Sequence, residues 1–444
     1  PKDVAGISIS GLYGGSGVPL DGDMQPVRPC IIWMDRRATK ESTWVEEKIG
    51  VDRLFEITGN GIDPYFGYTK ILWIKNNERD NWVRTQLFWP PHSYVIYKLT
   101  GEASTDYTSA GNMGGIYDLR ANTWSYELMD AMCIPHHMMP DKLIEPHEIA
   151  GTLTKEAARR LGLCEGIPVL GGAVDCLMST LAAGATKPGQ QVAVIGTSIN
   201  WGVLHNQFPT KRDYITMPYV IDAKDMYYTY GGASTAGALP NWFKNNFSKY
   251  IMGEDGTIKE ADYEDLNRLA EKIKPGSEGL LVLPYFMGER NPIWDPEARG
   301  TITGLTLHHT KAHVYRAFLE SVAFSLRHII ESFDMSPDHS AELFLIGGVT
   351  KSEVWKQIFA DVCGIPIKTS KDHIQAPLAD AFLAGVASGY IEDYSVIGKW
   401  VDFSDTMYPN DENHEIYSGY FEEYKKLYAS LKDNMKRMAS LAKE

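Results

Sequence analysis

Residues 169–184 read Val169-Leu-Gly-Gly-Ala-Val-Asp175-Cys-Leu-Met-Ser-Thr-Leu-Ala-Ala-Gly184. An apolar run ends in a glycine pair, an acid follows closely, and small residues then begin a predicted helix. The pattern therefore places the carboxylate of Asp175 at a strand-to-helix turn. At such a turn a substrate can approach the backbone, and the helix N-terminus favours negative charge. Taken alone, Asp175 is more simply interpreted as an ordinary helix N-cap.

A second turn follows twelve residues later, where the apolar run 192–195 ends in Gly196, Thr197 and Ser198. Its hydroxyl groups and free backbone amides are the groups that bind an anion. Together the two turns predict a base next to a phosphate-binding turn.

Composition limits the classes of protein to consider. A chain of 444 residues is too long for one ordinary core, so two or three domains are expected. The formal net charge of −14 argues against a nucleic-acid or anionic-membrane surface. We find no apolar run long enough to span a bilayer. The five cysteines are scattered without a CxxC spacing, which indicates neither a disulfide framework nor a zinc site and favours a reducing cytoplasm.

Three further polar or glycine-rich segments lie in the N-terminal part. The strand-like run 4–10 leads into the glycine-rich segment 11–17, which matches neither GxGxxG nor the P-loop and is either a ligand cradle or a flexible turn. Asp35 and Arg36 follow a buried-looking strand, where they could bind substrate hydroxyls or form a surface salt-bridge patch. The small polar segment 101–110 could line a hydroxyl-rich ligand or be a surface turn.

Strands and helices alternate along the chain, and glycine turns recur at strand ends in both halves, as at Gly347 and Gly348. This pattern predicts an α/β protein that binds ligands at the carboxyl ends of strands, with a cleft between two halves. A C-terminal stripe has helical spacing and is typical of a helix packed on a core; it consists of Tyr417, Tyr420, Phe421, Tyr424, Tyr428 and Leu431. A GxSxG elbow is missing, and the HxxxH spacing from His309 to His313 lacks the glutamate of a zinc hydrolase, so hydrolase functions are disfavoured.

The ordered motifs between residues 4 and 390 resemble the FGGY family of carbohydrate kinases, with the nearest likeness to pentulose kinases of the xylulokinase type. Residues 70–77 resemble the end of the family's first signature, although Gly67 stands where Pro, Ser or Thr is usual. The second signature is resembled by residues 300–305 with His313 and 317–320, where Phe318 is bulkier than expected. The series is completed by residues 288–292 with 294–296, and by residues 345–348 with Ser352 and Trp355.

The resemblance implies two ribonuclease-H-like domains of the actin and sugar-kinase type, in which ATP and sugar meet in the cleft. We expect an N-terminal, sugar-binding domain over residues 1–168, a C-terminal, nucleotide-binding domain over 169–400, and a helical segment over 401–444. The implied function is ATP-dependent phosphorylation of a ketose, a pentulose such as xylulose. Sugar kinases of this size are often dimers, and no nucleic acid or membrane partner is implied.

The resemblance also assigns roles to residues. Asp175 would be the general base on the sugar hydroxyl. The sugar would be held by Asp175 with Tyr13, Gly14, Trp33, Met34, Asp35 and Arg36. ATP would be bound by Gly196, Thr197, Ser198, Gly347, Gly348 and Ser352. Mg²⁺ would bridge the phosphates and keep several waters, so no protein metal ligand is expected.

Two departures from the family keep alternatives open. Xylulokinase-like members carry a sugar-contacting histidine in the first glycine loop, where this chain has Leu12, Tyr13, Gly14 and Gly15, so another ketose or a polyol becomes a candidate. The family's opening phosphate hairpin precedes the first residue of this chain, and a protein truly lacking it would have no kinase activity. A polyol kinase acting on glycerol or erythritol and a catalytically silent sugar-binding protein are therefore the alternatives.

Overall fold

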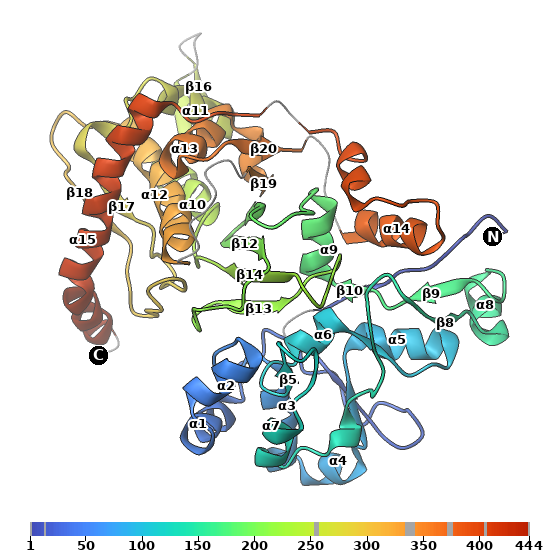
Figure 1. Cartoon of the computed structure of the whole chain (residues 1–444). Helices are drawn as coiled ribbons and strands as arrows, with labels where there is room; N and C mark the ends of the chain where they lie inside the picture. The colour runs from blue at the N-terminus through green and yellow to red at the C-terminus, as the bar shows by residue number, and fades with distance from the viewer. Residues whose placement is uncertain are drawn as a thin grey trace. The chain divides into compact units, whose positions relative to one another are not determined.

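The computed structural model describes residues 2–12, 15–252, 257–333, 342–370, 376–403 and 406–442. The chain divides into two compact units, each assembled from separate stretches of sequence (Figure 1). Unit 1 consists of Pro1–Pro188, Leu204–Thr229 and His373–Val401. Unit 2 consists of Gly189–Val203, Tyr230–Asp372 and Asp402–Glu444.

Unit 1 is built from short strands and helices. In chain order these are β1 Ser10–Gly11, β2 Val18–Leu20, α1 Thr39–Lys48, α2 Val51–Thr58, α3 Gly67–Asn77, α4 Arg79–Arg84, β3 Leu87–Trp89, α5 Pro91–Thr100, β4 Thr105–Asp106, α6 Tyr107–Asn112, β5 Tyr117–Asp118, β6 Thr123–Trp124, α7 Tyr126–Ala131, η1 His136–Met138, β7 Leu143–Ile144, β8 Ile149–Thr152, α8 Lys155–Leu161, β9 Pro168–Leu170, β10 Ala173–Val174, α9 Asp175–Ala182, β13 Ile215–Pro218, α14 Ala376–Ala387 and η4 Tyr394–Lys399.

Unit 2 carries the longer helices. Its elements are β11 Gln191–Ile195, α10 Ala238–Phe247, β15 Tyr250–Met252, β16 Ile258–Glu260, α11 Tyr263–Glu271, η2 Ser277–Gly279, β17 Leu281–Leu283, β18 Thr301–Thr303, α12 Lys311–Ser332, β19 Leu343–Gly347, η3 Gly348–Lys351, α13 Glu353–Cys363, β20 Ile367–Thr369 and α15 Asp411–Leu441. Strands β12 Ile199–His205 and β14 Tyr227–Gly231 each begin in one unit and end in the other. The predicted α/β class is confirmed.

The boundaries of the helices in unit 1 follow from local sequence. Helix α5 begins at Pro91, whose fixed φ and missing N–H suit the first helical position, and it ends at Gly101 with φ 79°. Helix α8 begins after Thr154, whose side chain accepts a hydrogen bond from the backbone N–H of Ala157. The apolar faces of α5 and α8 meet β9 in one core cluster, which includes Ile96 and Val169.

The largest sheet has the strand order β13-β14-β12-β11-β19-β20. Within unit 2, β11 and β12 form an antiparallel hairpin, and β19 runs parallel to β11 with Ile195 opposite Gly347. The parallel strands β11 and β19 therefore end side by side, each followed by a glycine turn.

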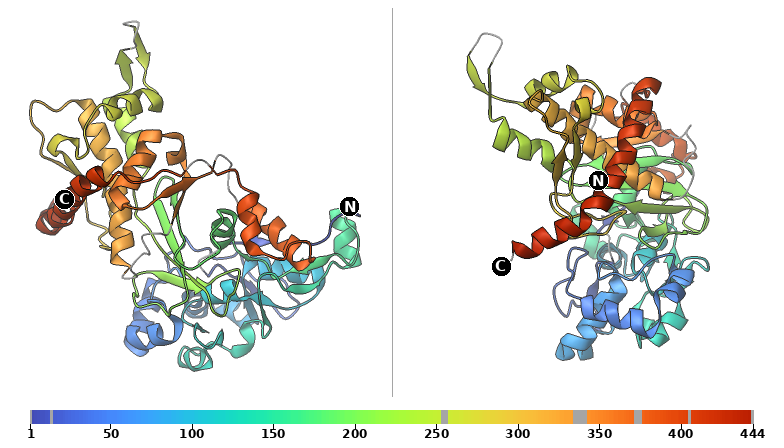
Figure 2. Two further views of the ribbon diagram at one scale, coloured as in Figure 1. Left: turned by 45° about the horizontal axis from the view of Figure 1, so that its top comes forward. Right: turned by 90° about the vertical axis from the view of Figure 1, so that its left-hand side faces the viewer.

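Helices α12, α13 and α15 pack together in unit 2. The indole N–H of Trp355 on α13 donates to the carbonyl of Leu319 on α12 at 3.0 Å. Tyr417, Phe421 and Tyr424 of α15 are fully buried and the other three members of the stripe are partly buried, so its predicted packing on a core is confirmed. The β15–β16 hairpin projects from unit 2 in both views of Figure 2. No helix of the described ranges is long and apolar enough to cross a membrane.

Candidate active site

Asp175 is the first residue of α9, and the N-cap of that helix is Val174. The interpretation of Asp175 as an N-cap is therefore wrong. Its Oδ1 is buried and has no hydrogen-bond partner among the described residues. Burial raises the pKa of Asp175 above its ordinary value, and the backbone N–H of Cys176 and the charge of His92 oppose the increase. An oxygen kept from both water and protein donors is suited to accept a proton from a bound ligand.

The position of Asp175 is fixed by the short parallel pairing of β1 with β10, in which Gly11 lies opposite Val174. A Cβ on Gly11 would lie 2.1 Å from the Nδ1 of His92, so only glycine allows the imidazole this close. Gly172 has φ +65°, and a Cβ there would lie 2.1 Å from the carbonyl oxygen of Ile9. The glycines of both strands thus permit the close approach that places Asp175 beside the first glycine loop.

A buried polar cluster supports this strand end. Asp106 caps α6 by accepting the backbone N–H of Ser109 at 3.0 Å. Its second oxygen is 2.7 Å from the Nε2 of His92, and the hydroxyl of Thr108 donates to its first. Asp106 and Thr108 are fully buried, so the interpretation as a surface turn is wrong for residues 104–110, whereas residues 101–103 are exposed.

The end of the first glycine loop contacts the segment around Trp33. The hydroxyl of Ser16 accepts the backbone N–H of Trp33 at 3.1 Å, and Gly17 pairs with Ile31. Gly15 lies against Gly67, whose own Cβ would be 2.6 Å from the sulfur of Met113. This crowding explains why glycine stands at position 67. Tyr13 and Gly14 lie outside the described residues.

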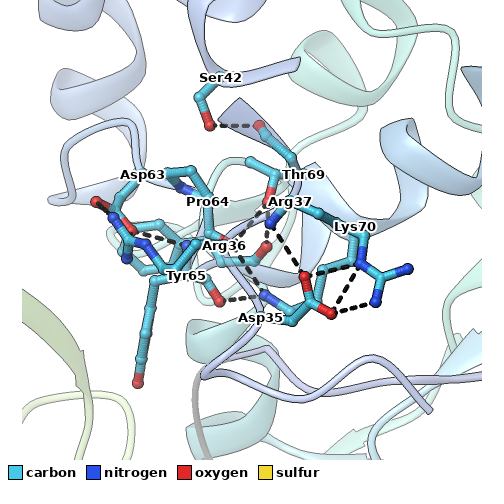
Figure 3. Close-up of polar contacts among 11 residues, drawn as sticks. Asp35, Arg36, Arg37, Ser42, Asp63, Pro64, Tyr65, Thr69 and Lys70 are labelled. Carbon is cyan, nitrogen blue, oxygen red and sulfur yellow. Dashed lines mark hydrogen bonds and ion pairs between the residues drawn. The ribbon is translucent and has the colours of Figure 1, made fainter. Parts of the chain in front are cut away.

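Figure 3 shows the acid and arginines that follow Trp33. The Nε of Arg37 lies 2.8 Å from both oxygens of Asp35, and this hydrogen bonding is the main reason that the pKa of Asp35 is lowered. Arg36 forms a bidentate ion pair with Asp63, with 2.8 Å between Nη2 and Oδ2. Met34 is 63% exposed and Trp33 is partly buried. Trp33, Met34, Asp35 and Arg36 are consecutive in the chain, and the charges of Asp35 and Arg36 are already paired.

Lys70 of α3 lies beside this segment and is also drawn in Figure 3. Its ammonium group is buried and donates to the carbonyls of Pro64 and Tyr65 at 2.9 and 2.7 Å. Burial lowers the pKa of Lys70 to about 8. The lysine therefore fixes the backbone beside Asp63, the partner of Arg36.

In unit 2 the two expected nucleotide turns are brought together. The turn at Gly196 ends β11, and the turn at Gly347 ends the adjacent parallel strand β19. Gly347 has φ +105°, and a Cβ there would lie 2.3 Å from the carbonyl oxygen of Ile195. Gly196, Thr197 and Gly348 are exposed, and nothing lies within 4 Å of the space a Cβ on Gly348 would occupy. The N–H of Gly196 donates to the carbonyl of Ser198 at 3.0 Å. The hydroxyl of the exposed Thr197 and the open backbone at Gly348 are therefore the groups that can accommodate an anionic ligand.

Two further polar side chains of unit 2, Ser352 and Glu289, belong to segments that adjoin these two turns. Ser352 is the N-cap of α13 and accepts the backbone N–H of Trp355 at 3.3 Å. Glu289 accepts the backbone N–H of Ser234 at 2.6 Å, while its Oε2 is buried without a partner in the described ranges. Burial raises the pKa of Glu289 to about 7. The turn at Ser234 continues to Ala236 and Gly237, whose N–H groups donate to the carbonyls of Thr197 and Gly196.

The sequence carries no signal for His92 or for the raised pKa of Glu289. The polar segment 101–110, which includes Thr108, is predicted to line a ligand or to be a surface turn, but nothing in the sequence marks His92 as its partner. Glu289 appears in the sequence only as part of a motif. Its unpartnered oxygen depends on packing between segments distant in sequence.

Both the N-terminal and the C-terminal part of the chain match models of known protein families. The model of the N-terminal domain of the FGGY family of carbohydrate kinases matches residues 1–182. The model of the C-terminal domain of the same family matches residues 191–388.

Known relatives extend over nearly the whole chain. It is 31% identical to the xylulose kinase of Bacillus subtilis, over 97% of this chain and 84% of that protein. Gluconokinase of the same organism is 27% identical over 94% of this chain and 80% of its own length, and its glycerol kinase is 27% identical over 94% and 84%. The crystal structure of ligand-bound xylulose kinase from Lactobacillus acidophilus aligns with a TM-score of 0.86 at 27% identity, covering 98% of this chain and 86% of that one.

Proposed function

Because the chain belongs to the FGGY family of carbohydrate kinases and is thus an ATP-dependent sugar kinase with the family's two-domain fold, we propose that its acceptor is a ketose, specifically a pentulose such as xylulose. Relatives named xylulose kinase support the choice of sugar. The observation that carries the mechanism is the buried Oδ1 of Asp175, which has no partner among the described residues.

In the proposed reaction Asp175 is the general base. The sugar hydroxyl donates its proton to Oδ1 while its oxygen forms a bond to the γ-phosphorus of ATP. The bond between that phosphorus and the bridging oxygen breaks, and ADP leaves with the electron pair. Phosphoryl transfer needs positioning and charge neutralisation more than covalent help, so a single well-placed proton acceptor suffices.

The nucleotide would bind at the two glycine turns of unit 2. Thr197 and Ser198 would contact the phosphates with their hydroxyl groups, and Gly196, which has no side chain, would leave room for the phosphates beside the turn. The open backbone at Gly347 and Gly348 would lie along the adenosine, and Ser352 would support this turn as the cap of α13.

We propose Mg²⁺ as the ion that accompanies ATP. The two turns offer no carboxylate, which fits an ion held by phosphate oxygens and waters, the ligands that Mg²⁺ keeps in such sites. When bound, the ion would neutralise phosphate charge during transfer.

Sugar recognition would fall to Trp33, Met34, Asp35 and Arg36, together with Tyr13 and Gly14 of the first glycine loop. Asp35 can accept hydrogen bonds from sugar hydroxyls while Arg37 holds it ionised. A polyol kinase is the second candidate, favoured by the segment 12–15, which has no histidine where xylulokinase-like members carry one. Glycerol kinase is among the relatives that match over most of the chain.

An ATP-consumption assay of the full-length protein tests these candidates across pentuloses, hexuloses, polyols and gluconate. We expect the highest kcat/KM with a pentulose. A highest kcat/KM with glycerol or erythritol would replace the ketose proposal by the polyol alternative. No turnover with any of these compounds would contradict both.

A further inference from the structure

We propose that Asp106 and Thr108 position the proposed base Asp175 through the backbone N–H of Val174, and that His92 holds Asp106 in place. The inference rests on the proposed role of Asp175. It assigns a role in phosphoryl transfer to a polar cluster that does not itself contact the reacting atoms.

The first link is Asp106, which is fully buried at the N-terminus of α6. One of its oxygens is occupied by the backbone N–H of Ser109 and the hydroxyl of Thr108. The other lies 2.7 Å from the Nε2 of His92, which is also buried. With donors on both oxygens and no solvent access, this carboxylate has one defined orientation.

The second link is Thr108. Its hydroxyl hydrogen is given to Asp106, so the lone pairs of the oxygen are left to accept hydrogen bonds. The backbone N–H of Val174 donates to this oxygen at 3.1 Å. The bond joins residues 66 positions apart in the chain and lies in the buried interior.

The third link is covalent. Val174 precedes Asp175 and is the N-cap of α9, so its backbone sets the direction in which the Asp175 side chain leaves the helix. No side chain of the described residues holds the Oδ1 of Asp175. The orientation of that oxygen therefore depends on the backbone that Thr108 fixes.

The opposite side of the same strand end is fixed by His92. Its ring lies so close to Gly11 that a Cβ there would be 2.1 Å from Nδ1, and Gly11 is paired with Val174. The cluster thus contacts both strands that carry the turn at Asp175. Misplacement of a catalytic group by about 1 Å can reduce turnover about 100-fold.

The test compares kcat and both KM values of Thr108→Val, Thr108→Ser and Ser93→Ala in the full-length protein. Valine keeps the shape of threonine but gives Val174 no acceptor, whereas serine restores the hydroxyl. We expect Thr108→Val to lower kcat by about 10- to 100-fold with each KM changed less than about threefold, and Thr108→Ser to retain most of the turnover. Ser93→Ala is the matched control, because Ser93 is equally buried and exchanges its hydrogen bond with Thr105, outside the contacts with Val174.

A kcat of Thr108→Val equal to that of Ser93→Ala would overturn the inference, and so would equal losses in the valine and serine variants. If Thr108→Val does not fold, Thr108→Cys supplies a weak acceptor of similar size, and its kcat should lie well below that of Thr108→Ser. A Cys variant as active as the Ser variant would contradict the inference. Asp175→Asn, measured in parallel, separates the two proposals, because its retained turnover would refute the base itself, whatever the Thr108 variants show.

Discussion

The two acids proposed to contact the sugar, Asp175 and Asp35, are held in opposite ways. Asp175 has a buried oxygen without a partner in the described part of the chain, whereas both oxygens of Asp35 accept hydrogen bonds from Arg37. Burial raises the pKa of Asp175, and Arg37 lowers that of Asp35. The difference indicates that Asp175 is arranged to take up a proton, while Asp35 is arranged to stay ionised and bind.

The contrast between Asp175 and Asp35 would be refuted if both acids responded in the same way to removal of their charge. Asp175→Asn should lower kcat by about 10²- to 10⁴-fold, the usual contribution of a general base, and leave sugar affinity largely unchanged. Asp35→Asn should act mainly on the KM for sugar. Steady-state kinetics with saturating ATP distinguishes the two. Near-normal turnover of Asp175→Asn would remove it as the base.

Glu289 in unit 2 sharpens the comparison, because it is a second acid with a buried oxygen left without a partner in the described ranges. Its pKa is raised from 4.5 to about 7, so the folded protein retains a proton that the unfolded chain has lost between these values. The free energy of unfolding should therefore fall, relative to Glu289→Gln, by about 3 kcal/mol as the pH rises from 4.5 to 7. Urea denaturation of both proteins across this range measures the gap, and a constant gap would contradict the account.

Gly11→Ala tests the close approach behind the Asp175 end of the loop. The added methyl group would meet the Nδ1 of His92 at 2.1 Å, so the ring or strand β1 must shift. We expect a loss of about 1–3 kcal/mol in stability together with reduced kcat. Gly22→Ala is the control, because nothing lies within 4 Å of the Cβ it would add. Equal effects of the two substitutions would show that the space at Gly11 is not restricted.

The smallest expected effects concern stability and carry opposite signs. The folded-state pKa of Asp35 is lowered, so its stabilising contribution is present above the unfolded pKa and is lost as the pH falls through the folded pKa. At neutral pH, Asp35→Asn should cost at most about 1 kcal/mol, because the pair with Arg37 is exposed. Asp175 has a raised pKa, so Asp175→Asn should instead raise Tm at neutral pH. Thermal denaturation at pH 7 that shifts both variants in the same direction would contradict this contrast.

Much of the fold was accessible from local sequence. The glycine pair before Asp175 marks the turn between β9 and β10, directly before α9, and the helical spacing of Tyr417, Phe421 and Tyr424 marks a face that is buried. Such features depend on residues close in the chain. The two- and three-residue strands of unit 1 are too short to show alternation, so sequence patterns could not define them.

The support of the candidate site was less accessible. Segment 101–110 is small and polar, a composition equally typical of surface turns, and the burial of residues 104–110 is seen only in the structure, where Asp106 hydrogen-bonds both Thr108 and His92. Likewise, glycine is needed at position 67 because Gly15 and Met113 approach it closely. These contacts join distant segments, so tertiary packing decides them.

The most direct test of the central claim is the structure of the full-length protein with its sugar bound. We predict that one sugar hydroxyl lies about 2.6–3.2 Å from the Oδ1 of Asp175, the range for direct proton transfer. A well-ordered sugar with every hydroxyl beyond hydrogen-bonding distance of that oxygen, or with Asp175 bonded to a protein donor instead, would contradict the account.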